Sequence, residues 1–267
     1  VLLLAVAMLV RQNQIVLPQL SVLGFADSEF ADRKQARAEA EYVCENLQPD
    51  DRVFYVSQGD NGEGWFSAVF DFYPVLVDYS SYESDPLGRM EWLKLYAALL
   101  GREDAACAYY DDLIAALAPV LDQEPTGQTV AFFYITTSGA VNVRKSGDYI
   151  AKAIRMAGGE YVSFDESGEE NALSTMTIQM ESFYDTALDA DVLIYNSTID
   201  GGITSIDELL AKSPLFADFK AVQTGNVWCI TKNFYQESLA LGDMILDVHA
   251  VLNNPDAADL RFLKKLS

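Results

Sequence analysis

The sequence predicts an α/β protein in which two Rossmann-like lobes are bridged by a long helix. Residues 82–118 form the longest stretch with helical periodicity, and residues 123–267 alternate between strand-like and helix-like segments. A helix of this length would extend on the order of 50 Å, more than one ordinary domain needs. A coiled coil is the alternative, but the apolar stripe is rich in aromatic residues and interrupted by Gly101. The pattern therefore favours a helix that connects two lobes.

This connecting helix is predicted over residues 82–122, between an N-terminal part, 1–81, and a C-terminal lobe, 123–267. The periodicity stops at Pro119, which cannot continue a helix without the loss of a hydrogen bond. The apolar positions that recur at helical spacing are Trp92, Leu93, Tyr96, Leu99 and Leu100, and then Ala106, Tyr109, Tyr110, Leu113 and Leu117.

The N-terminal part opens on ten apolar residues, VLLLAVAMLV, which are too few to span a bilayer. A buried strand or helix and the remnant of a membrane or signal segment both stay open as interpretations. A helix is predicted over 28–47, because Asp27 or Ser28 can cap it and good helix formers follow. β-branched and aromatic residues predict strands over 52–57 and 75–78.

The C-terminal lobe alternates strands and helices, which predicts βα crossovers and a mostly parallel sheet. The stretch 136–147 is expected to be a loop. Gly158-Gly159 is expected to end the helix at 148–157, before the next strand. Strands are predicted at 128–135, 160–164, 191–196 and 226–230, and helices at 148–157 (with Ile150, Ala153, Ile154 and Ala157 facing inward), 181–190, 205–213 and 241–252.

Composition excludes several classes of function. With 40 acidic residues against 18 basic ones, the net charge is −22, which argues against nucleic acid or an anionic membrane as the main partner. The three cysteines are widely spaced and His249 is the only histidine, so zinc sites, a disulfide framework and histidine-based triads are not predicted. No metal site and no cofactor are expected.

Four segments together resemble the substrate-binding proteins of ABC importers. They are SSYESDPLGRMEWLKLYAALLG, VNVRKSGDYIAKAIRMAGGEYVSF, DADVLIYNSTI and GNVWCITKNFYQESLALGDMILDVHAVL, within residues 74–267. The resemblance is to the helix-hinged class that captures ferric siderophores, haem or cobalamin. It implies an extracytoplasmic, non-enzymatic protein that binds a metal chelate between two lobes and delivers it to a permease.

The resemblance implies ligand contacts in loops that follow the strands, and carboxylates that dock onto the permease. Arginine suits an anionic chelate, and aromatic rings suit flat macrocycles or catechols. Glu181 stands where a docking carboxylate is expected, and Glu41 is its weaker N-terminal counterpart. The implied ligand residues are Tyr82, Arg89, Tyr134, Arg144, Asn196, Ser197, Phe234 and Tyr235.

Residues 1–73 depart from this family. A full N-terminal lobe would occupy more than a hundred residues, so that lobe is expected to be incomplete or divergent, and a truncated, divergent or joined sequence all stay open. These residues loosely resemble the soluble tail of a polytopic membrane glycosyltransferase. The alternative function is therefore a membrane-associated Rossmann-like enzyme, for which Asp189 and Asp191 have the spacing of a metal-binding DxD. Membrane anchoring of the binding protein is the companion expectation.

Overall fold

The chain divides into two compact units in the computed structural model. The smaller unit comprises residues 1–82 and 95–103, and the larger unit comprises residues 83–94 and 104–267. The structure describes residues 6–11, 14–16, 52–56, 80–165, 175–198, 202–231, 234–254 and 256–267.

Three sequence-based predictions lie outside the described residues. They are the helix at 28–47, the strand at 75–78 and the docking role of Glu41.

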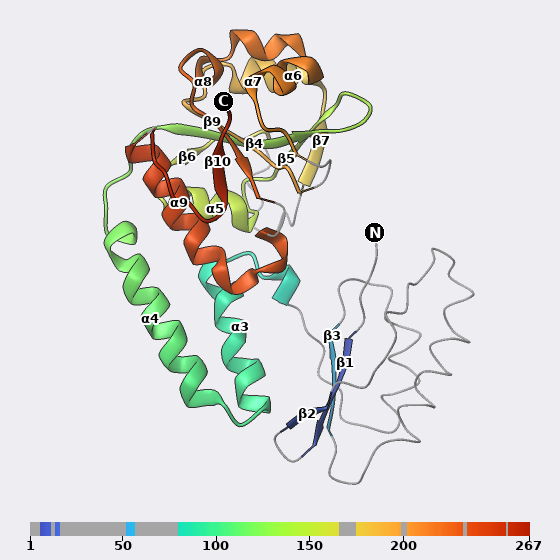
Figure 1. The fold of residues 1–267 in the computed structure, drawn as a ribbon, viewed down its shortest axis with the longest axis vertical. Coiled ribbons are helices and arrows are strands. Elements are labelled where there is room, and N and C mark those ends of the chain that lie inside the picture. The colour runs from blue at the N-terminus through green and yellow to red at the C-terminus, as the bar shows by residue number, and fades with distance from the viewer. Residues whose placement is uncertain are drawn as a thin grey trace, which may run out of the picture. The chain divides into compact units, whose positions relative to one another are not determined.

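The larger unit is built on a seven-stranded mixed sheet in the order β10-β9-β8-β4-β5-β7, with β6 paired to β4 (Figure 1). Strands β4, β6, β8 and β9 run parallel, as the alternation of strands and helices predicts. The α/β fold class is confirmed. The strands are β4 (Thr129–Ile135), β5 (Val141–Arg144), β6 (Glu160–Tyr161), β7 (Thr175–Ile178), β8 (Val192–Tyr195), β9 (Val227–Ile230) and β10 (Leu263–Lys265).

Antiparallel strands flank this parallel centre, so the prediction of a mostly parallel sheet holds only for the centre. β5 pairs antiparallel with β4 and β7, and β10 pairs antiparallel with β9. The loop predicted over 136–147 is wrong, because β5 lies within it. Val141 and Val143 are buried and alternate with half-buried Asn142 and Arg144. A strand of four residues is too short for this alternation to stand out in the sequence.

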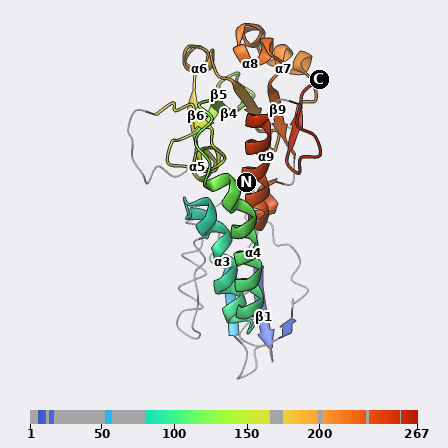
Figure 2. The same cartoon turned by 90° about the vertical axis from the view of Figure 1, so that its left-hand side faces the viewer.

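Helices cover both faces of the sheet (Figures 1 and 2). Helices α5 (Tyr149–Met156) and α9 (Leu241–Asn253) pack on one face, and α6 (Met180–Ala187), α7 (Ile206–Lys212) and α8 (Lys220–Gln223) pack on the other. The predicted inward residues of α5 are buried, as are Leu241, Ile245, Val248 and Leu252 of α9. Short 3-10 helices lie at η2 (Ser80–Tyr82), η3 (Pro214–Asp218), η4 (Phe234–Gln236) and η5 (Ser238–Ala240).

The end of α5 follows the glycine pair in the sequence. Gly158 has a φ of 89°, which is left-handed backbone that favours glycine. The Gly159 N–H donates to the Ile154 carbonyl and the Gly158 N–H donates to the Arg155 carbonyl, both at 3.0 Å. These two bonds form a Schellman motif, so the predicted helix end is confirmed.

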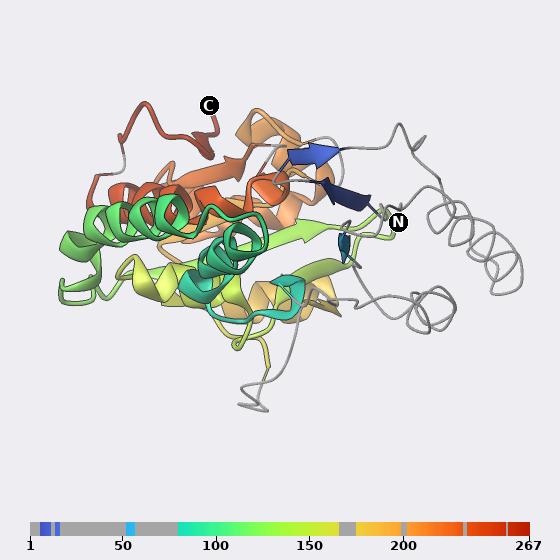
Figure 3. The same ribbon diagram turned by 90° about the horizontal axis from the view of Figure 1, so that it is seen from below.

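The single connecting helix predicted over 82–122 is wrong, because the structure has two helices there. Helix α3 (Pro86–Leu99) and α4 (Glu103–Leu121) are labelled as separate elements in Figure 1, and their teal and green ribbons are seen from below in Figure 3. Gly101 interrupts them with a φ of 65°, at the point where the apolar stripe is also interrupted.

The two helices contact each other after this turn. The Tyr110 hydroxyl of α4 donates to the Leu87 carbonyl of α3 at 3.4 Å, and Lys94 lies 4.0 Å from the centre of the Tyr110 ring. The predicted stop at Pro119 is also early, because α4 continues to Leu121. Pro119 removes one hydrogen bond of the helix, and only two residues of α4 follow it.

In the smaller unit, the described residues include a three-stranded antiparallel sheet. Strand β1 (Val6–Arg11) lies between β2 (Gln14–Val16) and β3 (Arg52–Val56). The strand predicted at 52–57 is confirmed, and the apolar opening includes a strand. Within the residues that the structure describes, no helix is both long and apolar enough to cross a membrane.

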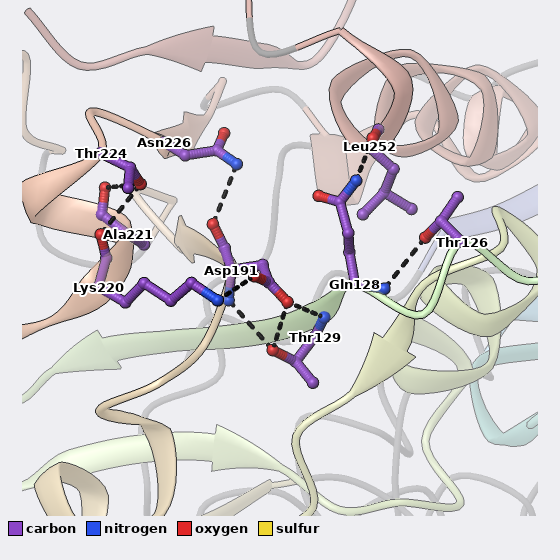
Figure 4. Close-up of polar contacts among 9 residues, drawn as sticks. All are labelled: Thr126, Gln128, Thr129, Asp191, Lys220, Ala221, Thr224, Asn226 and Leu252. Carbon is purple, nitrogen blue, oxygen red and sulfur yellow. Dashed lines mark hydrogen bonds and ion pairs between the residues drawn. The ribbon is translucent and has the colours of Figure 1, made fainter.

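A polar network fastens the amino ends of the central strands (Figure 4). Asp191, which precedes β8, accepts hydrogen bonds from the backbone N–H and the hydroxyl of Thr129 at 2.9 and 3.0 Å. Its second carboxylate oxygen pairs with the Lys220 ammonium at 2.7 Å. The Asn226 amide donates to the Asp191 carbonyl at 3.0 Å. The Asp191 carboxylate therefore connects β4 and α8 to the start of β8. The Asp191 backbone carbonyl accepts the hydrogen bond from Asn226, the residue before β9.

We expect Asp191→Ala to lower the free energy of unfolding by about 1–3 kcal/mol, because it leaves the Thr129 N–H and hydroxyl without their acceptor. Lys220→Ala is the control and should have the smaller effect, because the Lys220 side chain is 52% exposed and its ion pair is partly screened by water. Urea unfolding at pH 7 measures both. Equal losses in the two variants would contradict the network.

The same residue predicts a pH dependence. Burial alone would raise the pKa of Asp191, but the Lys220 ammonium and the Thr129 hydrogen bonds outweigh it and lower this pKa below its usual value. A carboxylate with a lowered folded pKa stabilises the fold above its unfolded pKa, and this contribution is lost as the pH falls through the folded pKa. The difference between wild type and Asp191→Ala should therefore shrink below about pH 4. A difference that stays constant in urea titrations from pH 7 to pH 3 would contradict the assignment.

Candidate ligand-binding site

A cluster of cationic, aromatic and amide side chains lies towards the carboxyl ends of the parallel strands. This is the edge of the sheet opposite to the amino ends, where Asp191 lies. Asn196 follows β8, and Tyr235 belongs to the short η4 helix after β9. Arg144 ends β5, and Tyr149 begins α5. Arg89 comes from the first turn of α3. The carboxyl ends of parallel strands are the usual place for ligands in open α/β sheets.

The Tyr235 hydroxyl is the centre of this cluster. Its oxygen accepts a hydrogen bond from the Arg144 guanidinium at 2.5 Å and another from the Asn196 amide at 3.2 Å. The Asn196 amide orientation is set by Thr198, whose hydroxyl donates to Asn196 Oδ1 at 2.6 Å. Three elements that are distant in the sequence therefore meet at one oxygen atom.

Asp148 compensates the charge of Arg144. Its Oδ2 lies 3.4 Å from the Arg144 guanidinium, and its Oδ1 caps α5 by accepting from the Ile150 N–H at 2.8 Å. The Asp148 side chain is only 5% exposed and that of Arg144 14% exposed, so this ion pair is largely removed from water. The pair therefore fixes Arg144 relative to the start of α5.

Arg89 stacks on the first residue of α5. Its guanidinium lies 3.8 Å from the centre of the Tyr149 ring, and its Nε donates to the Glu83 carbonyl at 2.6 Å. The start of α3 is itself fixed, because Asp85 Oδ1 accepts from the N–H groups of Leu87 and Gly88, both at 2.9 Å. Proline at the first helical position completes this start.

The protonation states follow from burial and from the partners. Burial raises the pKa of Tyr235, although Arg144 opposes this, and it also raises the pKa of Asp148 against the same guanidinium. Burial alone would lower the pKa of Arg144, but Tyr235 and Asp148 outweigh it and raise that pKa. At neutral pH Tyr235 is a protonated phenol, and Arg89 and Arg144 are cations.

The structure brings together four of the eight ligand residues implied by the resemblance, namely Arg89, Arg144, Asn196 and Tyr235. Sequence reasoning missed Asp148 and Tyr149. The signal was the SGDY sequence before α5, in which an aspartate at a helix start is followed by an aromatic residue.

The other four implied ligand residues make none of the polar contacts described above. Phe234 is a packing residue, because it is 3% exposed and meets Tyr235 and Phe262 ring to ring. Tyr134 packs with the core cluster that includes Phe133 and Phe183. Ser197 is buried, and Tyr82 is exposed. Their roles as ligand contacts stay predictions.

Glu181 and the candidate DxD pair, Asp189 and Asp191, are not part of this cluster. Glu181 is exposed in the first turn of α6, where it complements the helix dipole, and its docking role stays a prediction. Asp191 is occupied by Thr129 and Lys220, which favours a structural role over metal binding. Among the described residues, no group of three His, Cys, Asp or Glu side chains is placed to hold a metal ion.

The family of this chain follows from a match to the periplasmic binding protein model over residues 71–233, which is more than half of the chain. The chain belongs to the periplasmic binding protein family. This confirms the resemblance to the substrate-binding proteins of ABC importers, which bind small molecules and work with a permease, and the extracytoplasmic location that it implies. The match begins close to residue 74, where the resemblance in the sequence also begins.

Two curated relatives come from Methanocaldococcus jannaschii, and both are named as uncharacterized lipoproteins. One is 28% identical over 79% of this chain and 50% of its own length. The other is 27% identical over 59% of this chain and 40% of its own length. The chain therefore spans about half the length, or less, of the curated relatives it matches.

Solved structures share the fold. An Fe³⁺-hydroxamate transport protein from Saccharomonospora viridis has a TM-score of 0.58 at 18% identity, covering 75% of this chain and 68% of its own. A periplasmic haem-binding protein from Pseudomonas aeruginosa has a TM-score of 0.57 at 17% identity, covering 85% and 80%. Both likenesses show the fold alone.

The Asp148–Arg144 pair generates a stability prediction. We expect Asp148→Asn to destabilise the protein by about 3 kcal/mol, because the largely buried Arg144 cation loses its carboxylate while the cap is kept. Asp148→Ala should cost about 1 kcal/mol more, because the cap is lost as well. Urea unfolding followed by circular dichroism measures both values.

Glu91→Gln is the matched control, because it breaks an exposed ion pair with Lys94 on α3. It should change stability very little. An Asp148→Asn variant as stable as Glu91→Gln would contradict the role given to Asp148.

Proposed function

We propose that this protein is a non-catalytic capture protein that binds an anionic metal chelate and delivers it to an ABC permease. A ferric siderophore, haem or a corrinoid is the class of ligand. The observation that carries this proposal is the pair of arginines, Arg89 and Arg144, arranged with Tyr149 and Tyr235 at one edge of the sheet.

The chemistry of the cluster suits such a ligand. Guanidinium groups donate two parallel hydrogen bonds to a carboxylate or similar group and stay charged at every physiological pH. Tyrosine rings offer flat apolar surface with a polar end, as catechols and macrocycles require. Solved proteins of this fold include one named for ferric hydroxamate and one named for haem, which is consistent with the proposal.

The proposal extends to location and partner. The lipoprotein names of the two relatives support attachment to the outer face of a membrane by a lipid. Glu181 is the docking carboxylate that we propose for the larger unit, because it is exposed and lies away from the cluster at the start of α6.

We expect the protein to bind at least one of three probes, namely ferric desferrioxamine, haem and cyanocobalamin. Binding to the folded state raises its stability by mass action, by about 2.7 kcal/mol when free ligand is 100 times Kd. A thermal melt with and without each probe measures the shift, and quenching of tyrosine and tryptophan fluorescence gives Kd. Absence of a shift with every probe would overturn the proposal.

Arg89→Ala and Arg102→Ala form a matched pair of charge deletions. Arg89 lies in the cluster, whereas Arg102 is exposed at the turn between α3 and α4. Loss of a hydrogen bond to a charged group should weaken binding about 10- to 100-fold in Arg89→Ala and leave Arg102→Ala unchanged. Equal affinities would show that the cluster is not the site.

A further inference from the structure

The hydrogen bonds at the Tyr235 hydroxyl engage its oxygen but not its proton. The oxygen accepts from Arg144 and from Asn196. Neither donor can accept in return, since a guanidinium has no acceptor and the nitrogen of an amide has none. The amide cannot be turned around without a loss, because its oxygen already accepts from the Thr198 hydroxyl and N–H.

The hydroxyl proton therefore needs an acceptor from elsewhere. Within the described part of the chain, the hydrogen bonds of the Tyr235 hydroxyl are the two that it accepts. Two donors at the oxygen also polarise the O–H bond and make it a stronger donor. Tyr235 is only partly buried, whereas its neighbour Phe234 is buried.

We propose that Tyr235 donates its hydroxyl proton to an acceptor oxygen of the ligand, and that Arg144 and Asn196 are positioning residues that hold this hydroxyl in its donor state. This inference rests on the proposed function and narrows it. The ligand presents an oxygen acceptor at this point, such as a hydroxamate, catecholate or carboxylate oxygen, and Arg89 supplies the neighbouring positive charge.

A different use of the same oxygen would be direct coordination of iron by a phenolate. That use requires loss of the proton. Burial instead raises the pKa of Tyr235, which keeps the phenol protonated at neutral pH and favours the donor role. The two arrangements differ in their visible absorption. An iron phenolate adds a charge-transfer band, and a hydrogen-bonded phenol adds none.

Tyr235→Phe tests the donor role directly. It removes the hydroxyl and keeps the ring that packs on Phe234, so the fold should be retained. We expect the affinity for ferric desferrioxamine, haem or cyanocobalamin, whichever binds the wild type, to fall about 10- to 100-fold. Tyr184→Phe is the matched control, because its hydroxyl lies on the other face of the sheet and bonds to Asp218.

Asn196→Asp tests the positioning role by replacing a donor with an acceptor. The new carboxylate would take the Tyr235 proton, so we expect a loss of affinity of at least the same size as in Tyr235→Phe. In the Tyr235→Phe background, Asn196→Asp should reduce the affinity by a smaller factor than it does in the wild type, because there is no hydroxyl left to redirect.

The ultraviolet Raman doublet of tyrosine reports whether a phenol donates or accepts a hydrogen bond. It should show one tyrosine changing to a donor on binding. That change should be absent in Tyr235→Phe.

The outcomes separate the two proposals. Unchanged affinity in Tyr235→Phe, or a visible charge-transfer band that this variant abolishes, would overturn the donor role while the capture function stands. Failure of the wild type to bind any of the probes would overturn the proposed function, and the donor role with it.

Discussion

The largely buried Arg144 guanidinium is the constraint on which the candidate site depends. A cation that is 14% exposed must be matched by a nearby carboxylate and by hydrogen-bond acceptors, or it destabilises the fold by several kcal/mol. Asp148 provides the charge and Tyr235 provides an acceptor. Because these partners come from the start of α5 and from the segment after β9, satisfying one guanidinium also fixes the distance between them.

The two edges of the sheet use polar groups in different ways. At the amino edge, the Asp191 carboxylate is occupied by Thr129 and Lys220, so its hydrogen-bonding capacity is used within the protein. At the carboxyl edge, donors predominate and converge on the Tyr235 oxygen. This convergence of donors suits a ligand that presents acceptor atoms, whereas the closed network at the amino edge suits stability. The same α/β sheet therefore separates its structural end from the end at which we propose that the ligand binds.

The sequence predicted most elements of the larger unit because their local signals are strong. The apolar runs of β4, β8 and β9 and the 3.6-residue stripe of α5 each specify one kind of element. The resemblance also supplied Arg144, Asn196 and Tyr235, which the fold brings together. The resemblance also named Tyr134, which packs with the core cluster that includes Phe133; β4 is too nearly continuous in its apolar residues for alternation to show which face a residue takes. The turn at Gly101 was visible in the sequence as an interruption of the apolar stripe. Local periodicity does not say whether the same helix continues beyond such an interruption.

The charge of the whole chain and the charge of the cluster have opposite signs, and this difference determines how an anionic ligand would be selected. A net charge of −22 repels anions at long range, so electrostatic steering would not accelerate their capture. At physiological ionic strength, exposed charges are largely screened beyond about 8 Å. Partly buried guanidiniums at contact distance are screened much less than exposed charges and act through a lower effective dielectric. Selection for an anionic chelate would therefore occur at contact with Arg89, Arg144 and Tyr235, where the direction of each hydrogen bond matters more than total charge.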